Sequence, residues 1–185
     1  MLSGPTDAAN IIAFSGSHGT GKTTAMLDYA AKAKKTGSGN VGVLQETARD
    51  CPYPVLGVHC QRPSEVAEMW IFSAQINREL TESRKYDWLI SDRTIVDVIA
   101  YTVFGGHVSL AASMMQIARQ YMRRYHMIIF NSVRKNPYCL PDGFRSLDFE
   151  VRAKIEEILL NLYSELNVEL QDFTPHPQQG YQRNG

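Results

Sequence analysis

Short runs of apolar residues recur along the chain, separated by longer stretches in which apolar positions have helical spacing. The apolar runs are typical of buried strands, and they cover residues 11–14, 41–44, 87–92, 126–131 and 168–170. The stretches with apolar residues three and four positions apart predict helices at 23–31, 64–83, 94–104, 109–124 and 148–166. Strands that alternate with helices form parallel sheets with helices on both faces. The sequence therefore predicts an α/β protein with a five-stranded parallel sheet.

Breaks in this pattern mark a long loop and the ends of the chain. The Pro-containing segment 132–147 lacks strand or helix periodicity and has the length of a functional loop. The C-terminal segment is rich in Pro, Gln and Gly, and we expect flexible ends at residues 1–9 and 174–185. A chain of 185 residues without an internal repeat suits a single domain over residues 1–185.

The composition excludes several classes of protein. Nineteen basic residues balance nineteen acidic ones, so no overall field draws the chain to nucleic acid or to a membrane surface. The sequence has neither an apolar run of about 18 residues nor the start of a signal peptide. Cys51, Cys60 and Cys139 lack the spacing of a zinc site, and we interpret them as reduced thiols. We expect a cytoplasmic protein without a membrane partner.

The most specific motif lies between the first predicted strand and the first predicted helix. Residues 16–23 read Gly-Ser-His-Gly-Thr-Gly-Lys-Thr, a complete G-x-x-x-x-G-K-[ST] pattern. The glycines let backbone N–H groups point at phosphate oxygens, and the helix N-terminus adds positive charge. Lys22 is placed to reach the β- and γ-phosphates and Thr23 to hold Mg²⁺. The alternative is an ordinary glycine turn. We predict that ATP or GTP binds to Gly16, Ser17, His18, Gly19, Thr20, Gly21, Lys22, Thr23 and Thr24.

Two acidic residues end predicted strands, where ligands of parallel sheets bind. Asp92 is expected to support Mg²⁺ or to activate a hydroxyl, or else to cap the next helix. Arg93 beside it is placed to bind phosphate, or to pair with Asp97 at the surface. Glu46 is placed to orient or deprotonate an acceptor hydroxyl, or to pair with Arg49. We favour the reading in which these strand ends form one site.

The loop 132–147 follows the fourth predicted strand and carries Arg134, Lys135 and Arg145. Cations that close over a transferred phosphoryl group stabilise its negative charge and exclude water. We therefore predict a cationic lid, in which Arg134 and Arg145 are the catalytic candidates. A solvated basic loop is the alternative.

Two further features are less specific. Gln75 is placed to hydrogen-bond a nucleobase edge, or is otherwise an exposed residue of the helix at 64–83. The strongest basic patch fits either a solvated helix end or a contact with a nucleic-acid backbone. It consists of Arg119, Arg123, Arg124 and His126.

Together these residues resemble the nucleoside and nucleotide kinase branch of P-loop proteins over roughly residues 10–170. Glu46-Thr47-Ala48-Arg49 and Asp142-Gly143-Phe144-Arg145 are similar to segments of bacterial ribosylnicotinamide kinase domains. The pair Asp92-Arg93 is instead similar to deoxynucleoside and thymidylate kinases, because a threonine follows the acid in ribosylnicotinamide kinases. The resemblance implies a P-loop NTPase domain that uses ATP and Mg²⁺.

We therefore expect a kinase that transfers the γ-phosphate of ATP to a hydroxyl or phosphate of a nucleoside- or nucleotide-like acceptor. The expected catalytic residues are Lys22, Asp92, Glu46, Arg145 and Arg134, with Thr23 and Asp92 at the metal. The expected acceptor-binding residues are Glu46, Arg49, Gln75 and Arg93. One alternative is the same chemistry on a hydroxymethylated base within DNA, as in some phage-encoded relatives of this branch. Another is a nucleotide-hydrolysing switch or regulatory ATPase that phosphorylates nothing.

Overall fold

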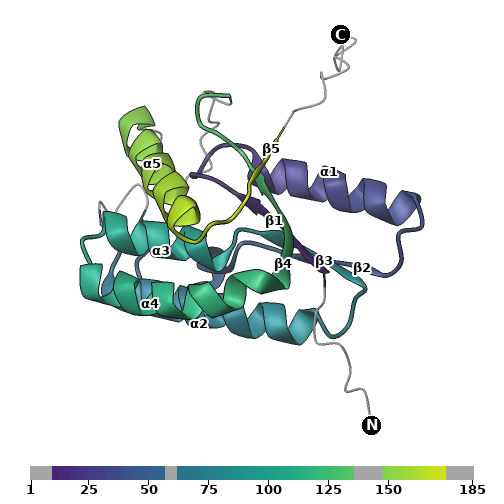
Figure 1. The fold of residues 1–185 in the computed structure, drawn as a ribbon, viewed down its shortest axis with the longest axis horizontal. Coiled ribbons are helices and arrows are strands. Elements are labelled where there is room, and N and C mark those ends of the chain that lie inside the picture. Colours follow the sequence, from purple (N-terminus) through teal and green to yellow (C-terminus); the bar gives the residue numbers. More distant parts are fainter. Residues whose placement is uncertain (1–9, 57–61, 136–147, 174–185) are drawn as a thin grey trace.

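Five parallel strands form one sheet in the order β2-β3-β1-β4-β5 (Figure 1). This computed structural model describes residues 10–56, 62–135 and 148–173. The strands are β1 (Asn10–Ser15), β2 (Val41–Leu44), β3 (Trp88–Asp92), β4 (Tyr125–Phe130) and β5 (Gln171–Asp172). The five-stranded parallel sheet that the sequence predicts is therefore confirmed.

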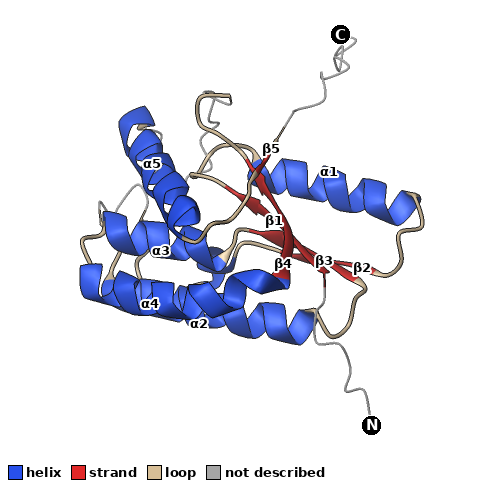
Figure 2. Ribbon diagram, in the orientation of Figure 1, coloured by secondary structure: helices blue, strands red, loops and turns tan. Residues whose placement is uncertain are grey.

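Helices cover both faces of the sheet, as predicted (Figure 2). One face packs against α1 (Lys22–Lys35). The other face packs against α2 (Glu65–Glu82), α3 (Ile95–Phe104), α4 (Val108–Tyr121) and α5 (Phe149–Glu165). Two short 3-10 helices complete the description, η1 (Thr47–Asp50) after β2 and η2 (Met122–Arg124) after α4. Within these ranges no helix is long and apolar enough to cross a membrane.

The side chains of β1 show how the sequence produces two buried faces. Ile12 and Phe14 pack in the cluster under α1, whereas Ile11 and Ala13 pack in the larger cluster on the opposite face. All four side chains are buried. A strand that is covered on both faces is apolar at every position, which is why the run 11–14 predicts a strand without any alternation.

The last strand lies further along the chain than residues 168–170, where the sequence predicts it. Asn167 has a left-handed φ of 53°, and the Val168 N–H bonds back to the Tyr163 carbonyl oxygen. These residues complete the C-terminal turn of α5 and cannot also pair with β4. Pairing begins at Gln171, which lies beside Ile129. The predicted strand at 168–170 is therefore misplaced, because the observed strand begins at Gln171.

The strand order brings the ends of the first four strands to one edge of the sheet. β1 lies between β3 and β4, and its register places Phe14 beside Asp92 and Ser15 beside Phe130. β2 pairs with β3, with Leu44 beside Ser91. The chain crosses from one side of β1 to the other after β3, and in such sheets this crossing marks the ligand-binding crevice.

Candidate functional site

The phosphate loop, residues 16–23, connects β1 to α1 and depends on its glycines. Gly16, Gly19 and Gly21 have φ values of 138°, 68° and 78°, a region in which a side chain is strained. A Cβ on Gly16 would also overlap the carbonyl oxygen of Asn131. Gly21 is the N-cap of α1 and has no side chain to bond the first turn. The N–H groups of that turn are therefore available to an anion.

Lys22 is buried within the loop. Its Nζ donates to the carbonyl oxygen of Ser17 at 2.6 Å and lies 3.4 Å from Thr20 Oγ1. Burial, followed by repulsion from Arg93, lowers the pKa of Lys22 to about 7. A phosphate beside the ammonium group would raise this pKa again, because an opposite charge favours the charged form. Lys22 is thus placed to exchange a carbonyl partner for a phosphate oxygen.

Thr23 and Asp92 meet beside the loop. The Thr23 hydroxyl donates to Asp92 Oδ2 at 2.5 Å, and Asp92 is buried at the end of β3. A hydroxyl and a carboxylate suit Mg²⁺, which takes its remaining ligands from water and nucleotide phosphates. Among the described residues no three His, Cys, Asp or Glu side chains form a metal site of their own. The donor set at Thr23 and Asp92 therefore fits a magnesium ion bound together with a nucleotide.

Arg93 is buried directly after β3 and holds two carboxylates. Its Nε donates to Glu46 Oε1 at 2.6 Å, and its Nη1 lies 3.4 Å from Asp97 Oδ1. Burial opposes the charge, but Glu46, Tyr101 and Asp97 together raise the pKa of Arg93 well above its ordinary value. The half-exposed Arg49 pairs with the other oxygen of Glu46 at 3.4 Å. The structure thus brings Glu46, Arg49 and Arg93 together, and the pair with Asp97 is buried rather than at the surface.

The backbone of Arg93 is strained. Its φ of 87° is in the left-handed region, which is costly for any residue other than glycine. The Arg93 N–H donates to the Phe14 carbonyl oxygen at 2.9 Å, and the Arg93 carbonyl oxygen accepts from the Ser91 hydroxyl at 2.9 Å. Strained residues that are held from several sides are concentrated at functional sites. This conformation turns the guanidinium group toward Glu46.

A pocket opens beside Arg93, between η1, α2 and α3. Its cavity volume is about 30 Å³, and the surrounding atom-free space of about 340 Å³ includes open solvent. Its lining residues are Ala48, Val55, Leu56, Glu68, Ile71, Arg93, Asp97, Val98 and Tyr101. Mostly apolar walls with a few charged groups are typical of sites for small organic molecules. The pocket is therefore the candidate acceptor site.

Gln75 does not line this pocket. It is buried, and its amide donates to Glu79 Oε1 at 2.8 Å and to Ser91 Oγ at 3.2 Å. Its carbonyl oxygen accepts from the Thr47 hydroxyl. The amide thus links η1 to β3, and the alternative of an exposed helix residue is wrong. The predicted contact of Gln75 with a nucleobase stays a prediction.

Glu79 is the centre of this internal network. It is fully buried, and it accepts hydrogen bonds from the hydroxyls of Tyr121 and Tyr125, each at 2.9 Å. Burial raises the pKa of Glu79 to about 7, although the hydrogen bonds from Gln75 and the two tyrosines act in the opposite direction. This carboxyl group contacts the Ser91 hydroxyl of β3 and does not line the pocket.

Asp97 belongs to the site, although its place in the sequence suggests only a surface partner of Arg93. Its Oδ2 accepts from the Thr94 N–H and its Oδ1 from the Gly16 N–H, at 2.9 and 3.2 Å. Thr94 and Asp97 form a capping box at the start of α3. The spacing Thr-x-x-Asp is the signal that marks such a box. It does not reveal that the same carboxylate also holds the first glycine of the phosphate loop.

Arg152 and Tyr101 were missed altogether. Arg152 lies on α5 with 1% of its surface exposed, and it donates to the carbonyl oxygens of His18 and Gly19. Tyr101 lies on α3, and its hydroxyl is 3.0 Å from His18 Nδ1. These contacts join residues 134, 133 and 83 positions apart in the chain. No local pattern predicts contacts of that length.

Only part of the predicted lid lies within the described residues. Arg134 is exposed after β4, and the Lys135 ammonium pairs with Asp172 at 3.0 Å. Arg145 and the rest of 136–147 lie outside the described residues, as do Cys60 and Cys139. The catalytic roles of Arg134 and Arg145 stay predictions.

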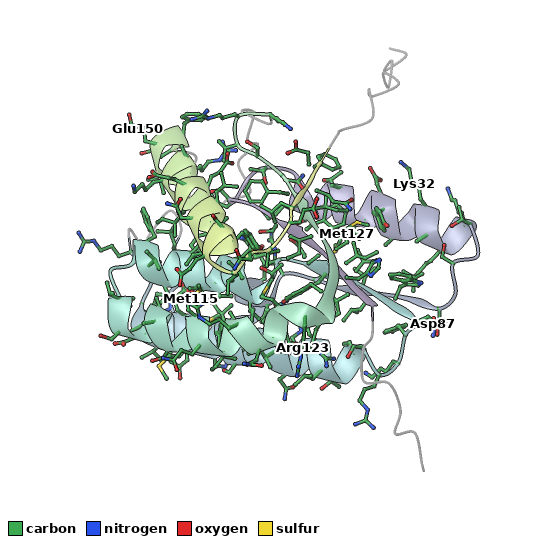
Figure 3. The ribbon with its side chains drawn as sticks, in the orientation of Figure 1. Lys32, Asp87, Met115, Arg123, Met127 and Glu150 are labelled. Atoms are coloured by element: carbon green, nitrogen blue, oxygen red, sulfur yellow. The ribbon has the colours of Figure 1, made fainter. Side chains whose placement is uncertain are left out.

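The basic patch lies at the far end of the sheet from the phosphate loop. Residues 119–126 precede or begin β4, whereas the loop follows the end of the parallel strand β1. A strand of six residues separates the two ends by about 17 Å. Figure 3 shows Arg123 at that far end, away from Glu150 at the start of α5. Arg119 pairs with Glu165, and Arg124 donates to the Ser83 hydroxyl.

The chain is similar to a known protein family and to several solved structures. A family model described as an AAA domain matches residues 11–179. A comparison by sequence with curated proteins gives no significant match. Among solved structures, thymidylate kinase from Ehrlichia chaffeensis is similar, with a TM-score of 0.62 and 17% identity over 89% of this chain and 92% of that one.

Two more solved structures share the fold. Deoxyadenosine kinase from M. mycoides has a TM-score of 0.59 and 15% identity, over 90% of both chains. The NadR protein in complex with NR has a TM-score of 0.65 and 15% identity, over 94% of this chain and 47% of NadR. The chain thus spans about half the length of NadR. At these identities the likeness shows the fold alone, and the family model covers most of the chain. The chain belongs to the AAA domain family and has the fold of the P-loop nucleoside and nucleotide kinases.

Proposed function

We propose that the protein is an ATP-dependent kinase that phosphorylates a hydroxyl or phosphate group of a nucleoside- or nucleotide-like small molecule. One observation carries this proposal above the others. The Thr23–Asp92 pair and the Arg93–Glu46 pair are neighbours, because Asp92 and Arg93 are consecutive residues at the end of β3. Glu46 follows the end of the adjacent strand β2. A metal-binding pair and an acceptor-facing pair so close together suit transfer between two bound molecules.

The donor side consists of the phosphate loop. In this proposal the N–H groups of the loop and of the first turn of α1 bind the β- and γ-phosphates. Lys22 leaves the Ser17 carbonyl oxygen and neutralises charge on the same phosphates. Thr23 and Asp92 hold Mg²⁺, directly or through water. A bound Mg²⁺ supplies charge stabilisation to the phosphate oxygens.

The acceptor side consists of the pocket beside Arg93. The acceptor oxygen forms a bond to the γ-phosphorus, the bond from that phosphorus to the bridging oxygen of ADP breaks, and the acceptor proton passes to a carboxylate. We assign this proton to Glu46, because its carboxylate lies against Arg93, which lines the pocket, whereas Asp92 lies on the metal-binding side with Thr23. Arg93 and Arg49 hold Glu46 in position.

A DNA acceptor is less favoured than a small molecule. The arginines expected to follow a DNA backbone lie at the end of the sheet opposite the phosphate loop, and two of them have protein partners. A DNA strand bound to this patch would lie at the end of the sheet opposite the phosphate loop, away from the pocket. The likeness to thymidylate kinase and deoxyadenosine kinase also supports a small acceptor.

The test is a transfer assay with γ-labelled ATP, Mg²⁺ and a panel of nucleosides, nucleoside monophosphates and hydroxymethylated DNA. We expect label on a small acceptor and little on DNA. Lys22→Ala should abolish transfer, whereas Lys32→Ala, a change on the outer surface of α1, should leave it intact (Figure 3). Release of labelled phosphate without any labelled acceptor would overturn the proposal in favour of a regulatory ATPase.

A further inference from the structure

Arg152 is a buried cation whose role the proposed reaction does not yet explain. It lies in the first turn of α5, with 1% of its surface exposed. Removing a guanidinium group from water costs free energy unless its N–H groups find acceptors. Its Nε donates to the His18 carbonyl oxygen at 3.0 Å and its Nη2 to the Gly19 carbonyl oxygen at 3.1 Å. Two consecutive peptide groups of the phosphate loop are therefore among its acceptors.

These two hydrogen bonds determine which way the loop peptides face. A trans peptide unit is planar, and its C=O and N–H point in opposite directions. The unit that carries the His18 carbonyl also carries the Gly19 N–H, and the next unit carries the Thr20 N–H. Because both carbonyls point at Arg152, both N–H groups point away from α5. Gly19 has a φ of 68° and no side chain, so little else resists rotation of these peptides.

The charge of Arg152 also acts on the N–H groups. A hydrogen bond from a charged donor polarises a carbonyl group more than a neutral donor does. Polarisation passes along the peptide and makes its N–H a stronger donor. Lys22 makes a similar contact with the preceding carbonyl, that of Ser17, so cations bind three consecutive carbonyls of the loop. Lys22 has a phosphate to move to, whereas Arg152 is anchored in the first turn of α5.

We propose that Arg152 is a positioning residue that holds the Gly19 and Thr20 N–H groups toward the nucleotide and strengthens them as donors to its β- and γ-phosphates. It acts through the main chain of the loop and does not touch the nucleotide. The inference rests on the proposed use of ATP. It extends the candidate site to α5, a helix that contributes no other residue to the phosphate loop among the contacts described above.

The experiment compares Arg152→Met and Arg152→Lys with the control Lys154→Met. Lys154 is an exposed cation on the same helix, paired with Glu157. For Arg152→Met we expect the Kd of ATP to rise about 10- to 100-fold, because two charge-assisted hydrogen bonds are lost, while the Kd of adenosine stays within about twofold. Arg152→Lys, which keeps the charge but has no fork, should fall between Arg152→Met and wild type. Lys154→Met should match wild type.

A second readout requires no nucleotide. In ¹H–¹⁵N spectra of the free protein, the Gly19 and Thr20 amide protons of Arg152→Met should shift upfield, while those of Lys154→Met should not. Unchanged Gly19 and Thr20 signals together with unchanged ATP affinity would overturn the inference. A fall in kcat without either change would overturn it too, because it would mean direct contact with the transferred phosphate. If wild-type protein does not bind ATP, the proposed function fails, and the amide signals still decide this inference. If Arg152→Met does not fold, Arg152→Lys provides both readouts.

Discussion

The buried carboxyl group of Glu79 leads to a prediction about stability that can be worked out from the structure. Replacing Glu79 by Gln keeps the size and shape of the side chain but removes its ability to ionise. In the folded protein the pKa of Glu79 is raised from 4.5 to about 7, mainly because the side chain is buried. Hydrogen bonds from Gln75, Tyr121, Tyr125 and Ser91 lower this pKa but do not cancel the effect of burial.

The sign of the pH dependence follows from proton binding. Between pH 4.5 and about 7 the folded state holds a proton on Glu79 that the unfolded state has lost, so stability falls as the pH rises. Each pKa unit corresponds to about 1.4 kcal/mol, so wild type should lose about 3 kcal/mol relative to Glu79→Gln across this interval. For a chain of this length that corresponds to a difference of roughly 6–12 °C in Tm.

The assay is urea unfolding of both proteins between pH 5 and 8, followed by tryptophan fluorescence. Trp70, on the same helix as Glu79, and Trp88 report the transition. The difference between the two unfolding free energies at each pH isolates Glu79, since other titrating groups are shared. Glu82→Gln, on the same helix and paired with Lys85, is the control for loss of a helix carboxylate. Parallel pH profiles for wild type and Glu79→Gln would refute the reasoning.

Three further predictions concern the site. Asp92→Asn should lower single-turnover transfer by orders of magnitude, because an amide neither carries charge toward Mg²⁺ nor accepts a proton; a loss of stability alone would leave Asp92 a structural role only. Glu46→Gln should impair use of the acceptor while the Kd of ATP, measured by titration calorimetry, stays near the wild-type value; full activity would exclude Glu46 as the base. Gly16→Ala should weaken ATP binding at least tenfold, because its Cβ meets the Asn131 carbonyl oxygen; unchanged calorimetric affinity would show that the loop shifts freely.

Local patterns were sufficient to predict most of the fold. Strands buried on both faces are apolar at every position, and the phosphate loop has fixed spacing between a strand and a helix. The carboxyl-end rule for parallel sheets then brings Glu46, Asp92 and Arg93 together without any knowledge of the tertiary structure. The last strand was misplaced because the end of α5 uses residues that have strand-like composition.

The rest of the site depends on contacts that no local pattern contains. The Asp97 carboxylate reaches Gly16 across 81 positions, and Arg152 reaches His18 across 134. Gln75 shows a second limit. A glutamine in a helix is normally exposed, and its burial here depends on Glu79 one turn later and on tyrosines from α4 and β4 that complete the network. Burial of a polar side chain is decided by partners elsewhere in the chain.

The strained backbone of Arg93 has a consequence for how this position can change during evolution. Glycine would relieve the positive φ, which costs of the order of 1–3 kcal/mol. It would also remove the buried cation between Glu46 and Asp97, at about 3–5 kcal/mol, and leave Glu46 paired with the half-exposed Arg49. Lysine would retain the strain and lose the fork. Neither substitution is therefore neutral, and loss of Arg93 favours compensating changes at Glu46 and Asp97. We therefore expect the residues at positions 46, 93 and 97 to change together.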